Sequence, residues 1–556
     1  MTTLGENIQI TIGDLLDRSA GRYPHNEALV YPGRNLRYTY RQFQHECNRV
    51  AKGLMALGIK RGEHIAIMAP NLPQWVLAQF ASAKMGAVLV TVNTNYKVFE
   101  LEYLLRHSDA TTLIFSAGIK DSNYLEMVCE LCPELENSMP GRLNSKKLPM
   151  LRNVVFIGEN PAPGIFTWDE MLEMGEGISD EELAARQDSL DPDDVINMQY
   201  TSGTTGFPKG VMLSHKNLVG NAVSIGKCMN FGPDDRLCIP VPLFHCFGCV
   251  LGTLTCVTAS ATMVMIESFN PVTVLEAVER ERCTALHGVP TMFITELEVL
   301  ENRRYDTSSL RTGIMAGAPC PIEVMRAVVE KMGMREIVIT YGQTEAAPGI
   351  TMTRVDDPLE IRVSTVGKAL EGVEVKVVDP ATGRELPAGC QGEICARGYN
   401  VMKGYYKMPE ATAAAIDEDG WLHTGDLGIM DENGYLRITG RIKDMIIRGG
   451  ENIYPREVEE FLYTHPQVKD VQVVGVPSAK YGEEVMAFIQ LKEGAMVSED
   501  EIKEFCEGKI ARYKIPSYIH FVTAFPTTAN GKVQKFKLRE MGIKLARLDE
   551  DMLGTA

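Results

Sequence analysis

Residues 195–213 read VINMQYTSGTTGFPKGVML, which places a polar loop between two apolar runs. The runs at 195–200 and 211–213 predict strands, so the segment is expected to form a strand, a loop and a second strand. The loop contains serine and threonine hydroxyls, glycines and the ammonium of Lys209. Glycines let backbone N–H groups turn inward, and the hydroxyls and the ammonium are further donors to anionic oxygens. We therefore interpret residues 201–210 as a loop that grips polyphosphate.

The setting of this loop excludes an ordinary P-loop kinase or nucleotide hydrolase. A Walker P-loop opens a helix and has the spacing Gly-x4-Gly-Lys-Ser/Thr. Here a strand is expected after the loop, and from Gly203 to Lys209 the spacing is Gly-x2-Gly-x2-Lys. A Gly/Ser/Thr loop taken alone is also compatible with a surface turn, so the interpretation depends on motifs further along the chain.

Length and charge limit the class of protein. A chain of 556 residues with 45% hydrophobic content predicts more than one globular domain and large mixed α/β cores. The formal net charge of −17 argues against a nucleic-acid-binding protein and against adhesion to anionic membranes. Local donors must therefore hold any anionic ligand.

Neither the first residues nor the longest uncharged stretch predicts export or a membrane span. Residues 1–20 include Glu6, Asp14 and Asp17 and have no apolar centre, so no secretory signal is expected. Within 240–266 the sole acidic or basic side chain is His245, but prolines, glycines and threonines interrupt the run. A buried helix followed by a buried strand fits this pattern better than a transmembrane helix.

The 13 cysteines are odd in number and scattered, which favours reduced thiols in a cytoplasmic protein. Two pairs have Cys-x2-Cys spacing, namely Cys129/Cys132 and Cys246/Cys249, but they lie too far apart in sequence for a zinc ribbon. We interpret all four as packed thiols rather than as a metal or redox site.

Helix-like and strand-like segments alternate from about residue 10 to 440, as in a layered α/β fold. Residues 116–150 and 158–194 break the rhythm and are expected to be loop-rich or irregular. The clearest predictions are helices at 40–57 and 74–85 and strands at 64–68 and 88–92.

From 373 to 440 the pattern becomes β-rich, with a hairpin turn at Asn433-Gly434. Past Arg441 a small α/β unit is predicted, with a helix near 456–463, strands near 471–476 and 485–491, and a helix opened by a capping box at Ser498 and Glu501. We therefore expect a domain at 1–440, a hinge at 441–444 and a second domain at 445–556.

A cluster of chemical groups follows the apolar strand expected at 337–340. Residues 341–345 read YGQTE and place an aromatic ring, a hydroxyl and a carboxylate at the carboxyl end of the strand, where ligands collect in α/β folds. Tyr341 is suited to stacking on a nucleobase, and Glu345 is suited to holding a hard cation such as Mg²⁺. Taken alone, the segment is also compatible with a solvated strand end.

Three later segments add further groups. Residues 421–426, WLHTGD, place the Asp426 carboxylate in a glycine-tightened turn, where it is suited to accepting hydrogen bonds from a ribose diol. Residues 440–444, GRIKD, lie at the expected boundary, and the glycines of 448–455, RGGENIYP, permit close approach of a thin ligand. Residues 530–532, NGK, present a lysine on a tight turn.

In this order and approximate spacing, the segments resemble those of the adenylate-forming superfamily, which includes acyl-CoA synthetases, luciferases and nonribosomal adenylation domains. The resemblance covers most of the chain. It implies an α/β fold with a large N-terminal domain of stacked sheets and a small β-barrel, followed by a smaller, mobile α/β lid domain. The implied reaction has two steps, in which a carboxylate and ATP form an acyl-adenylate and pyrophosphate, and a thiol then displaces AMP.

The resemblance also implies roles for individual residues. The 201–209 loop would grip the β- and γ-phosphates, Thr344 would contact the α-phosphate, and Glu345 would bind Mg²⁺. Gly317 and Ala318 would border the adenine and acyl pockets beside Tyr341. The residues implied for ATP and AMP are Thr201, Ser202, Gly203, Thr204, Thr205, Gly206, Lys209, Gly317, Ala318, Tyr341, Gly342, Gln343, Asp426 and Arg441.

The second domain would serve both steps. Asp426 and Arg441 would fix the ribose, and Lys532 would bridge the carboxylate and the α-phosphate during adenylation. The domain would then rotate about Lys443, which removes Lys532 and brings the coenzyme A-binding residues Gly449, Gly450 and Glu451 toward the pantetheine arm.

The segment PLFHCFG at 242–248 helps to choose the substrate. Amino-acid-activating members place an Asp directly after the corresponding Phe, whereas this chain has His245, which disfavours an α-amino acid. In acyl-CoA synthetases this histidine lines the acyl pocket, although a buried, satisfied histidine is the alternative. The segment HGVPTMF at 287–293 resembles those of medium-chain and broad fatty acyl-CoA synthetases.

We therefore expect an AMP-forming carboxylic acid:CoA ligase that acts on a medium-chain or other aliphatic acid. An aromatic or alicyclic acid is the alternative substrate. A noncatalytic nucleotide or acyl-CoA binding protein is the alternative class, but it is disfavoured because Glu345, Asp426, Arg441 and Lys532 are all present. The expected ligands are ATP, Mg²⁺, coenzyme A and a small carboxylic acid, and both a monomer and a homodimer remain open.

Overall fold

The computed structural model describes residues 8–119, 122–201, 208–318, 320–448, 451–478, 480–527 and 533–553. The chain divides into two compact units, each of which we describe by itself. The first comprises Met1–Val363, Gly367–Val375 and Ala396–Leu422, and the second comprises Ser364–Val366, Lys376–Cys395 and His423–Ala556. The expected boundary at 440–444 concerns the point about which the second domain rotates. A division into compact units does not test it, so it stays a prediction.

The first unit contains a nine-stranded sheet with a parallel centre and antiparallel edges. Strands β16, β15, β14, β12, β13 and β1 pair in parallel in that order. In sheet order the strands are β18 (Lys368–Ala369), β17 (Gly349–Met352), β16 (Glu336–Gly342), β15 (Thr312–Met315), β14 (Ala285–Leu286), β12 (Arg236–Ile239), β13 (Thr262–Met265), β1 (Glu27–Tyr31) and β2 (Leu36–Thr39).

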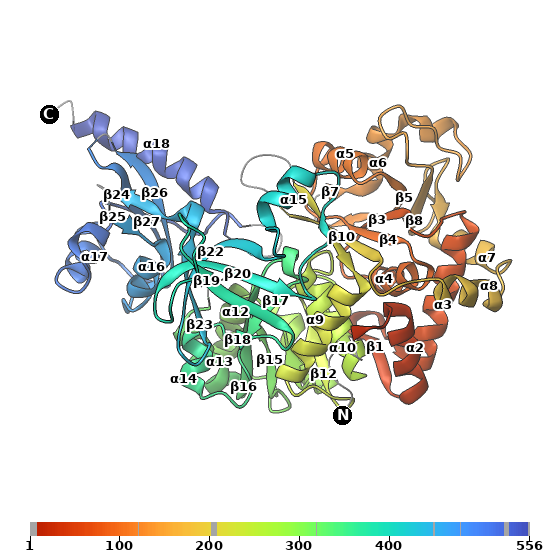
Figure 1. Ribbon diagram of the computed structural model, residues 1–556, viewed down its shortest axis with the longest axis horizontal. Coiled ribbons are helices and arrows are strands. Elements are labelled where there is room, and N and C mark those ends of the chain that lie inside the picture. The colour runs from red at the N-terminus through yellow and green to blue at the C-terminus, as the bar shows by residue number, and fades with distance from the viewer. Residues whose placement is uncertain are drawn as a thin grey trace. The chain divides into compact units, whose positions relative to one another are not determined.

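A second sheet of eight strands lies in the same unit (Figure 1). Its central strands β4 and β5 are buried along their whole length, as expected of parallel strands covered on both faces. In sheet order the strands are β21 (Gly404–Tyr405), β11 (Lys209–Ser214), β10 (Val195–Thr201), β4 (Val88–Thr91), β3 (His64–Met68), β5 (Ala110–Ser116), β8 (Asn153–Ile157) and β9 (Phe166–Thr167).

Helix α4 (Pro73–Met85) is buried on nearly all sides, and Figure 1 shows it between strand β4 of one sheet and the region of α2 and β1 of the other. A helix without a polar face belongs inside a layered core. The other helices of this unit are α2 (Ile12–Arg22), α3 (Tyr40–Ala56), α5 (Val98–His107), α6 (Tyr124–Leu131), α7 (Trp168–Gly175), α8 (Asp180–Asp188), α9 (His215–Cys228), α10 (Thr255–Ala259), α11 (Pro271–Glu281), α12 (Pro290–Asn302), α13 (Ile322–Met332), α14 (Leu359–Ser364) and α15 (Pro409–Ala415).

The β-rich segment forms a four-stranded sheet where a small barrel was expected, and among the described residues its two edge strands do not pair with each other to close a barrel. Its strands are β19 (Val373–Val378), β20 (Gln391–Gly398), β22 (Leu422–Met430) and β23 (Leu436–Arg441).

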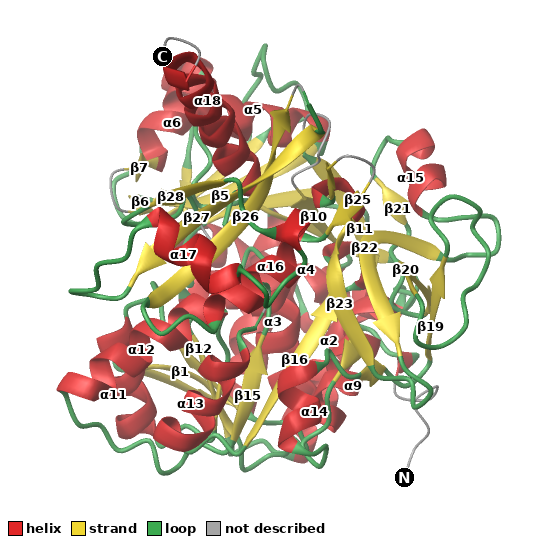
Figure 2. Cartoon of the chain, turned by 90° about the vertical axis from the view of Figure 1, so that its left-hand side faces the viewer, coloured by secondary structure: helices red, strands yellow, loops and turns green. Residues whose placement is uncertain are grey.

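The second unit also contains a five-stranded sheet between helices. One core packs α16 (Pro455–Tyr463) and α17 (Glu499–Cys506) on the sheet, and another packs α18 (Lys535–Leu553) against it. Figure 2 shows α18 and α17 on opposite sides of these strands. The strands are β25 (Glu451–Ile453), β24 (Ile446–Arg448), β27 (Gly482–Leu491), β26 (Val468–Ser478) and β28 (Tyr518–Phe521).

Most predicted elements are confirmed within one to three residues. The loop at 201–210 lies between antiparallel strands β10 and β11, as expected. The hairpin at Asn433-Gly434 joins β22 to β23, and Ser498 caps α17 through the predicted box with Glu501. The mixed α/β class, with a large N-terminal part and a smaller C-terminal part, is therefore confirmed.

Two segments predicted to be irregular contain helices, so those predictions were wrong in part. Helix α6 lies within 116–150 and buries Tyr124 and Leu131. Helices α7 and α8 lie within 158–194, and each begins with a capping box, at Thr167 and Ser179. These boxes fix the helix starts because side chain and backbone exchange hydrogen bonds.

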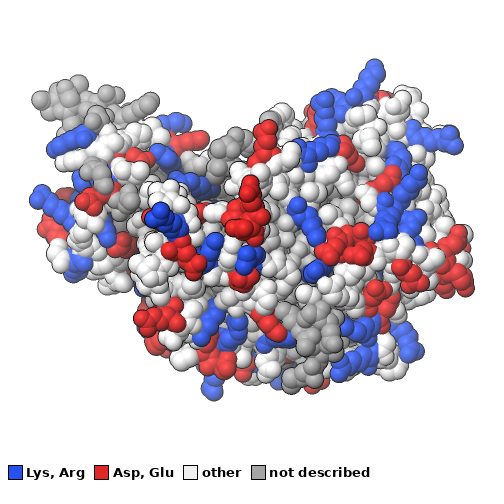
Figure 3. Space-filling view, in the orientation of Figure 1, with Lys and Arg blue, Asp and Glu red and all other residues white. Residues whose placement is uncertain are grey.

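The uncharged stretch at 240–266 is buried inside the first unit. A π-helix covers Phe247–Leu254, α10 follows it, and strand β13 comes next, which confirms the predicted buried helix and strand. No helix among the described residues is long and apolar enough to cross a membrane. On the face drawn in Figure 3, acidic and basic side chains of the described residues are interspersed.

Gly342 ends β16 where the backbone of β17 approaches closely. A Cβ placed on Gly342 would lie 1.9 Å from the carbonyl oxygen of Pro348. We predict that Gly342→Ala lowers the free energy of unfolding by about 1–3 kcal/mol, the usual cost of forcing backbone apart in a packed region. Thermal and urea unfolding measure this, with Gly33→Ala as the control because nothing lies within 4 Å of a Cβ there. Equal stability of the two variants would contradict the prediction.

Candidate functional site

Four neighbouring parallel strands of the nine-stranded sheet end at the same edge. The chain leaves β12 toward His245, β14 toward His287 and β15 toward Gly317, and Tyr341 lies at the end of strand β16, next to its final residue Gly342. Gly288 also forms a parallel bridge with Met315, which keeps the ends of β14 and β15 together. Because the carboxyl ends of parallel strands lie side by side, segments far apart in sequence form one site.

The YGQTE segment lies at this edge, as predicted. Tyr341 is 9% exposed, and Gly342 and Gln343 follow it toward the short helix Thr344–Ala346. In the neighbouring strand end, Gly317 is exposed and has a φ of +84°, which favours glycine, and Ala318 is half-buried.

The expected phosphate loop is anchored at both ends by the hairpin of β10 and β11. Thr201 pairs directly with Lys209 across the two strands. Outside the hairpin, the hydroxyl of Tyr103 donates to the carbonyl of Pro208 at 3.0 Å. The loop residues Ser202, Gly203, Thr204, Thr205 and Gly206 lie outside the described residues.

Glu345 meets the base of this hairpin. Its carboxylate oxygen Oε1 accepts a hydrogen bond from the Tyr405 hydroxyl at 2.8 Å and a longer one from the Thr201 hydroxyl at 3.5 Å. The Lys209 ammonium lies 4.2 Å from the centre of the Tyr405 ring. Burial, followed by the Glu345 charge, raises the pKa of the Tyr405 phenol, which therefore stays a donor.

A carboxylate beside a threonine hydroxyl provides hard oxygen ligands, and this chemistry fits a Mg²⁺ ion at Glu345. The sequence analysis did not single out Tyr405, which contacts two of the predicted site residues, Glu345 and Lys209.

His245 lies half-buried at the end of the β12 segment. Its Nδ1 accepts from the Phe247 N–H at 3.2 Å and lies 3.6 Å from the Cys246 sulfur. The same sulfur lies 3.9 Å from the Thr344 hydroxyl, so His245 and Thr344 lie on either side of one cysteine. Burial raises the pKa of Cys246 to about 12, which keeps this thiol protonated and inert as a nucleophile.

Cys246 and Cys249 are both buried free thiols, and in the other Cys-x2-Cys pair Cys132 is buried and Cys129 half-buried.

His287 is fully buried beside Phe247, with ring centres 5.6 Å apart. Its Nδ1 accepts from the Ile314 N–H at 3.1 Å, so Nε2 carries the proton and donates to the Leu251 carbonyl at 3.1 Å. Burial lowers the pKa of His287 to about 4. The ring is therefore neutral at physiological pH and provides an uncharged wall.

In the second unit, Asp426 and Arg441 form one pair. They lie directly opposite each other in β22 and β23, and Nε of Arg441 is 2.8 Å from Oδ1 of Asp426. Asp426 is 5% exposed, so a ribose hydroxyl would meet a carboxylate that the guanidinium already orients.

Glu393 supports the turn before Asp426. Its two carboxylate oxygens accept from the Gly425 N–H at 3.0 Å and from His423 Nδ1 at 2.9 Å. Potential ligand atoms of Glu393, Cys395 and His423 lie within 4.8 Å of one another. Because these hydrogen bonds already use His423 Nδ1 and both carboxylate oxygens, we interpret the cluster as support for the turn.

The remaining predicted residues are placed only in part. Lys443 lies exposed in the short helix Ile442–Asp444 that follows β23, and Glu451 is exposed at the start of β25. Gly449, Gly450 and Lys532 lie outside the described residues. The structure therefore leaves their roles as predictions.

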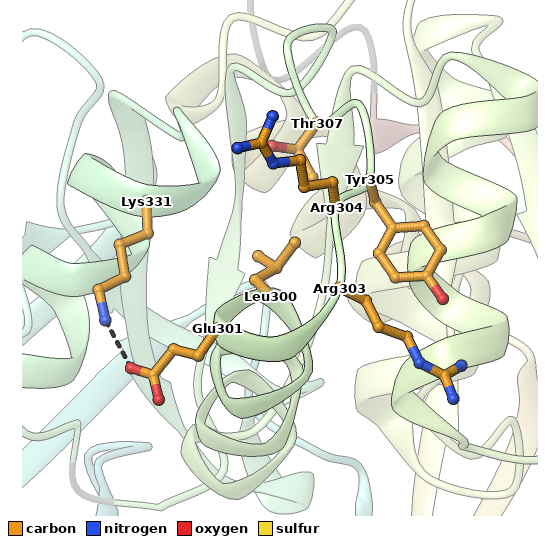
Figure 4. Close-up of a pocket in the computed structure, with 7 residues that line it drawn as sticks. All are labelled: Leu300, Glu301, Arg303, Arg304, Tyr305, Thr307 and Lys331. Atoms are coloured by element: carbon orange, nitrogen blue, oxygen red, sulfur yellow. Dashed lines mark hydrogen bonds and ion pairs between the residues drawn. The ribbon is translucent and has the colours of Figure 1, made fainter.

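A separate surface pocket of about 500 Å³ lies near the end of α12 (Figure 4). Arg303 and Arg304 point in different directions there, and Lys331 is bound to Glu301 at 2.8 Å. None of the predicted site residues lines this pocket, so it is not the candidate site.

The sequence matches known families over most of its length. Residues 16–406 match the AMP-binding enzyme family, and residues 457–532 match the AMP-binding enzyme C-terminal domain. The chain is 57% identical to a Bacillus subtilis protein named putative acyl-CoA synthetase YngI, over 98% of this chain and 99% of that protein. It is 43% identical to medium-chain acyl-CoA ligase ACSF2, mitochondrial, of Rattus norvegicus, over 95% of this chain and 87% of that protein.

Solved structures of similar enzymes superpose on this protein over nearly its whole length. ATP-bound MatB from Rhodopseudomonas palustris superposes with a TM-score of 0.84 at 30% identity, over 96% of this chain and 100% of that chain. The anthranilate CoA ligase AuaEII in complex with anthranoyl-AMP superposes with a TM-score of 0.85 at 30% identity, over 98% and 100%.

The low pKa of His287 predicts a loss of stability in acid. In the unfolded chain this histidine has a pKa near 6.5, whereas in the folded protein its pKa is about 4. The neutral ring therefore contributes its full share to the free energy of unfolding above pH 6.5, and this share declines as the pH falls from 6.5 to 4. We predict that His287→Asn makes the melting temperature less dependent on pH between 6.5 and 4.

The exposed His25 is the matched control, and His25→Asn is expected to follow the wild-type profile. Buried His215, with a pKa also lowered to about 4, keeps part of the slope in both variants. Parallel profiles for His287→Asn and wild type would contradict the assignment.

Proposed function

The chain belongs to the AMP-binding enzyme family and is an AMP-forming acyl-CoA synthetase, and from this premise we propose that it activates a medium-chain aliphatic carboxylic acid. The proposed length of the acid rests on the 43% sequence identity between this protein and a medium-chain acyl-CoA ligase, over 95% of this protein. The buried apolar side chains beside His245, Phe244 and Phe247, agree with a substrate whose tail has no charge.

The reaction begins when the carboxylate attacks the α-phosphorus of ATP and pyrophosphate leaves. The thiol of coenzyme A then attacks the acyl carbonyl of the adenylate, and AMP leaves. Neither step needs a covalent bond to the protein. The protein therefore contributes by positioning the substrates and by stabilising the charge that develops in the transition state.

We assign the first-unit residues as follows. The hairpin from Thr201 to Lys209 holds the β- and γ-phosphates, and Thr344 contacts the α-phosphate. Glu345, with the Thr201 hydroxyl beside it, would hold Mg²⁺, which supplies charge neutralisation on the phosphates when bound. The ring of Tyr341 stacks on the adenine next to Gly317 and Ala318.

The second-unit residues complete the assignment. The oriented carboxylate of Asp426 and the guanidinium of Arg441 bind the ribose. Lys532 contacts the carboxylate and the α-phosphate during adenylation only. Rotation about Lys443 then exchanges Lys532 for Gly449, Gly450 and Glu451, which line the path of coenzyme A.

His245 lines the acyl pocket, close to the reacting carboxylate. Its Nδ1 is oriented by the Phe247 N–H, and the Cys246 sulfur separates its ring from Thr344. An aromatic acid is the second candidate substrate, because an enzyme named as an anthranilate CoA ligase superposes with a TM-score of 0.85.

We further propose a cytoplasmic location, in keeping with thirteen free cysteines.

Acid-dependent exchange between ATP and pyrophosphate, measured without coenzyme A, tests the proposed function. We expect exchange to be highest with unbranched medium-chain acids, because burial of each further methylene contributes about 0.8 kcal/mol until the pocket is full. A maximum with benzoate-like acids would transfer the assignment to the aromatic class. If no acid in a broad panel supported exchange, the result would favour the alternative class, a noncatalytic nucleotide or acyl-CoA binding protein.

Lys532→Ala separates the two half-reactions. Loss of one electrostatic donor costs about a hundredfold or more in rate, so we expect adenylation to fall by that factor. Thioester formation from supplied acyl-adenylate and coenzyme A should continue near the wild-type rate, because Lys532 has left the site in that step. Rapid-quench assays of each half-reaction measure this, and an equal loss in both would refute the role.

A further inference from the structure

We propose that Tyr405 is a positioning residue that holds the Glu345 carboxylate and the Lys209 ammonium in one arrangement for Mg²⁺-ATP. The inference rests on the proposed roles of Glu345 and Lys209. Nothing in the sequence motifs of this site includes Tyr405, which lies 60 residues after Glu345.

Backbone hydrogen bonds before and after Tyr405 hold it beside Glu345 and the hairpin of β10 and β11. The short strand β21 adds to the edge of the eight-stranded sheet, where Tyr405 pairs with Val211 of β11. Two residues before this strand, the Met402 N–H donates to the carbonyl of Glu345 at 2.9 Å. Directly after the strand, the Tyr406 N–H donates to the carbonyl of Gly210 at 2.8 Å. The segment 402–406 therefore joins the backbone of Glu345 to the hairpin that carries Lys209.

The phenol hydroxyl fixes the carboxylate. It donates to Glu345 Oε1 at 2.8 Å, and Thr201 donates to the same oxygen at 3.5 Å. Among the described residues no hydrogen-bond donor contacts Oε2 of Glu345, which leaves that oxygen for a cation. A carboxylate held in one rotamer loses less entropy when it binds an ion than one that rotates freely.

The phenol ring positions Lys209. Lys209 and Val211 lie on the same face of β11, so Lys209 is the diagonal neighbour of Tyr405 in the sheet. Its ammonium lies 4.2 Å from the ring centre, within the range of a cation–π contact. The ring is 6% exposed and cannot swing away without opening the sheet edge.

The next residue provides a matched control. Tyr406 also donates its hydroxyl to a carboxylate, Asp109 Oδ2 at 2.9 Å, but this pair involves no proposed site residue. Removing one hydroxyl from each tyrosine in turn therefore distinguishes a role in positioning from a general loss of a tyrosine–carboxylate hydrogen bond.

The experiment compares Tyr405→Phe, Tyr405→Leu and Tyr406→Phe with wild type in the full-length chain. For Tyr405→Phe we expect the Mg²⁺ concentration at half-maximal ATP–pyrophosphate exchange to rise about tenfold, the equivalent of one hydrogen bond to a charged group. The KM of the carboxylic acid should not change. Tyr405→Leu also removes the ring, so it should raise the KM of ATP as well. Tyr406→Phe should match wild type in Mg²⁺ and ATP dependence.

Thermal shift gives a second readout that does not require turnover. At fixed ATP, the Mg²⁺ concentration needed for half of the rise in melting temperature should increase about tenfold in Tyr405→Phe and stay unchanged in Tyr406→Phe. Superimposed Mg²⁺ titrations of wild type and Tyr405→Phe would overturn the inference. A lower kcat with an unchanged Mg²⁺ requirement would also overturn it, because it indicates a structural role only.

The two proposals fail in different ways. If wild type shows no exchange with any acid, the proposed function fails, and the thermal-shift titration still decides whether Tyr405 tunes the response to Mg²⁺-ATP. If wild type is active and its Mg²⁺ dependence equals that of Tyr405→Phe, the function stands and the role of Tyr405 is refuted.

Discussion

Parallel pairing of β12, β14, β15 and β16 is the constraint on which the site depends. It brings the ends of these four strands to one edge, although they are spread along the chain from Ile239 at the end of β12 to Gly342 at the end of β16. Each strand end then contributes a different group, from the His245 ring to the Glu345 carboxylate. The sheet supplies the rigidity, and the loops that leave it supply the chemistry.

Although the chain is acidic, two of the cations that we propose for ATP binding are each oriented by a neighbouring group. Lys209 lies against an aromatic ring, and Arg441 is oriented by the carboxylate beside it. Both contacts reduce the freedom of a long side chain, so the donor needs no broad basic surface to be effective. The net charge of −17 therefore describes the protein as a whole and does not prevent individual cations from binding an anionic ligand.

Elements with strong local signals could be predicted from the sequence. Apolar strands that end in glycine-rich or polar turns gave the hairpin at 195–214 and the position of Tyr341 to Glu345. Helix α6 was missed because prolines and polar residues surround its apolar face, and α7 and α8 were missed although both carry capping boxes. Tyr405 and Glu393 could not be assigned, because what places them is pairing between distant strands, and no local pattern records such pairing.

The cross-strand pair of Asp426 and Arg441 has a consequence for how this protein can diverge. Side chains alternate between the two faces of a strand, so one residue inserted or deleted within Leu436–Gly440 would turn the guanidinium to the opposite face. Substitutions in that stretch leave the alternation intact, whereas a change of length does not. Among functional descendants of this chain, β23 should therefore vary in sequence far more freely than in length.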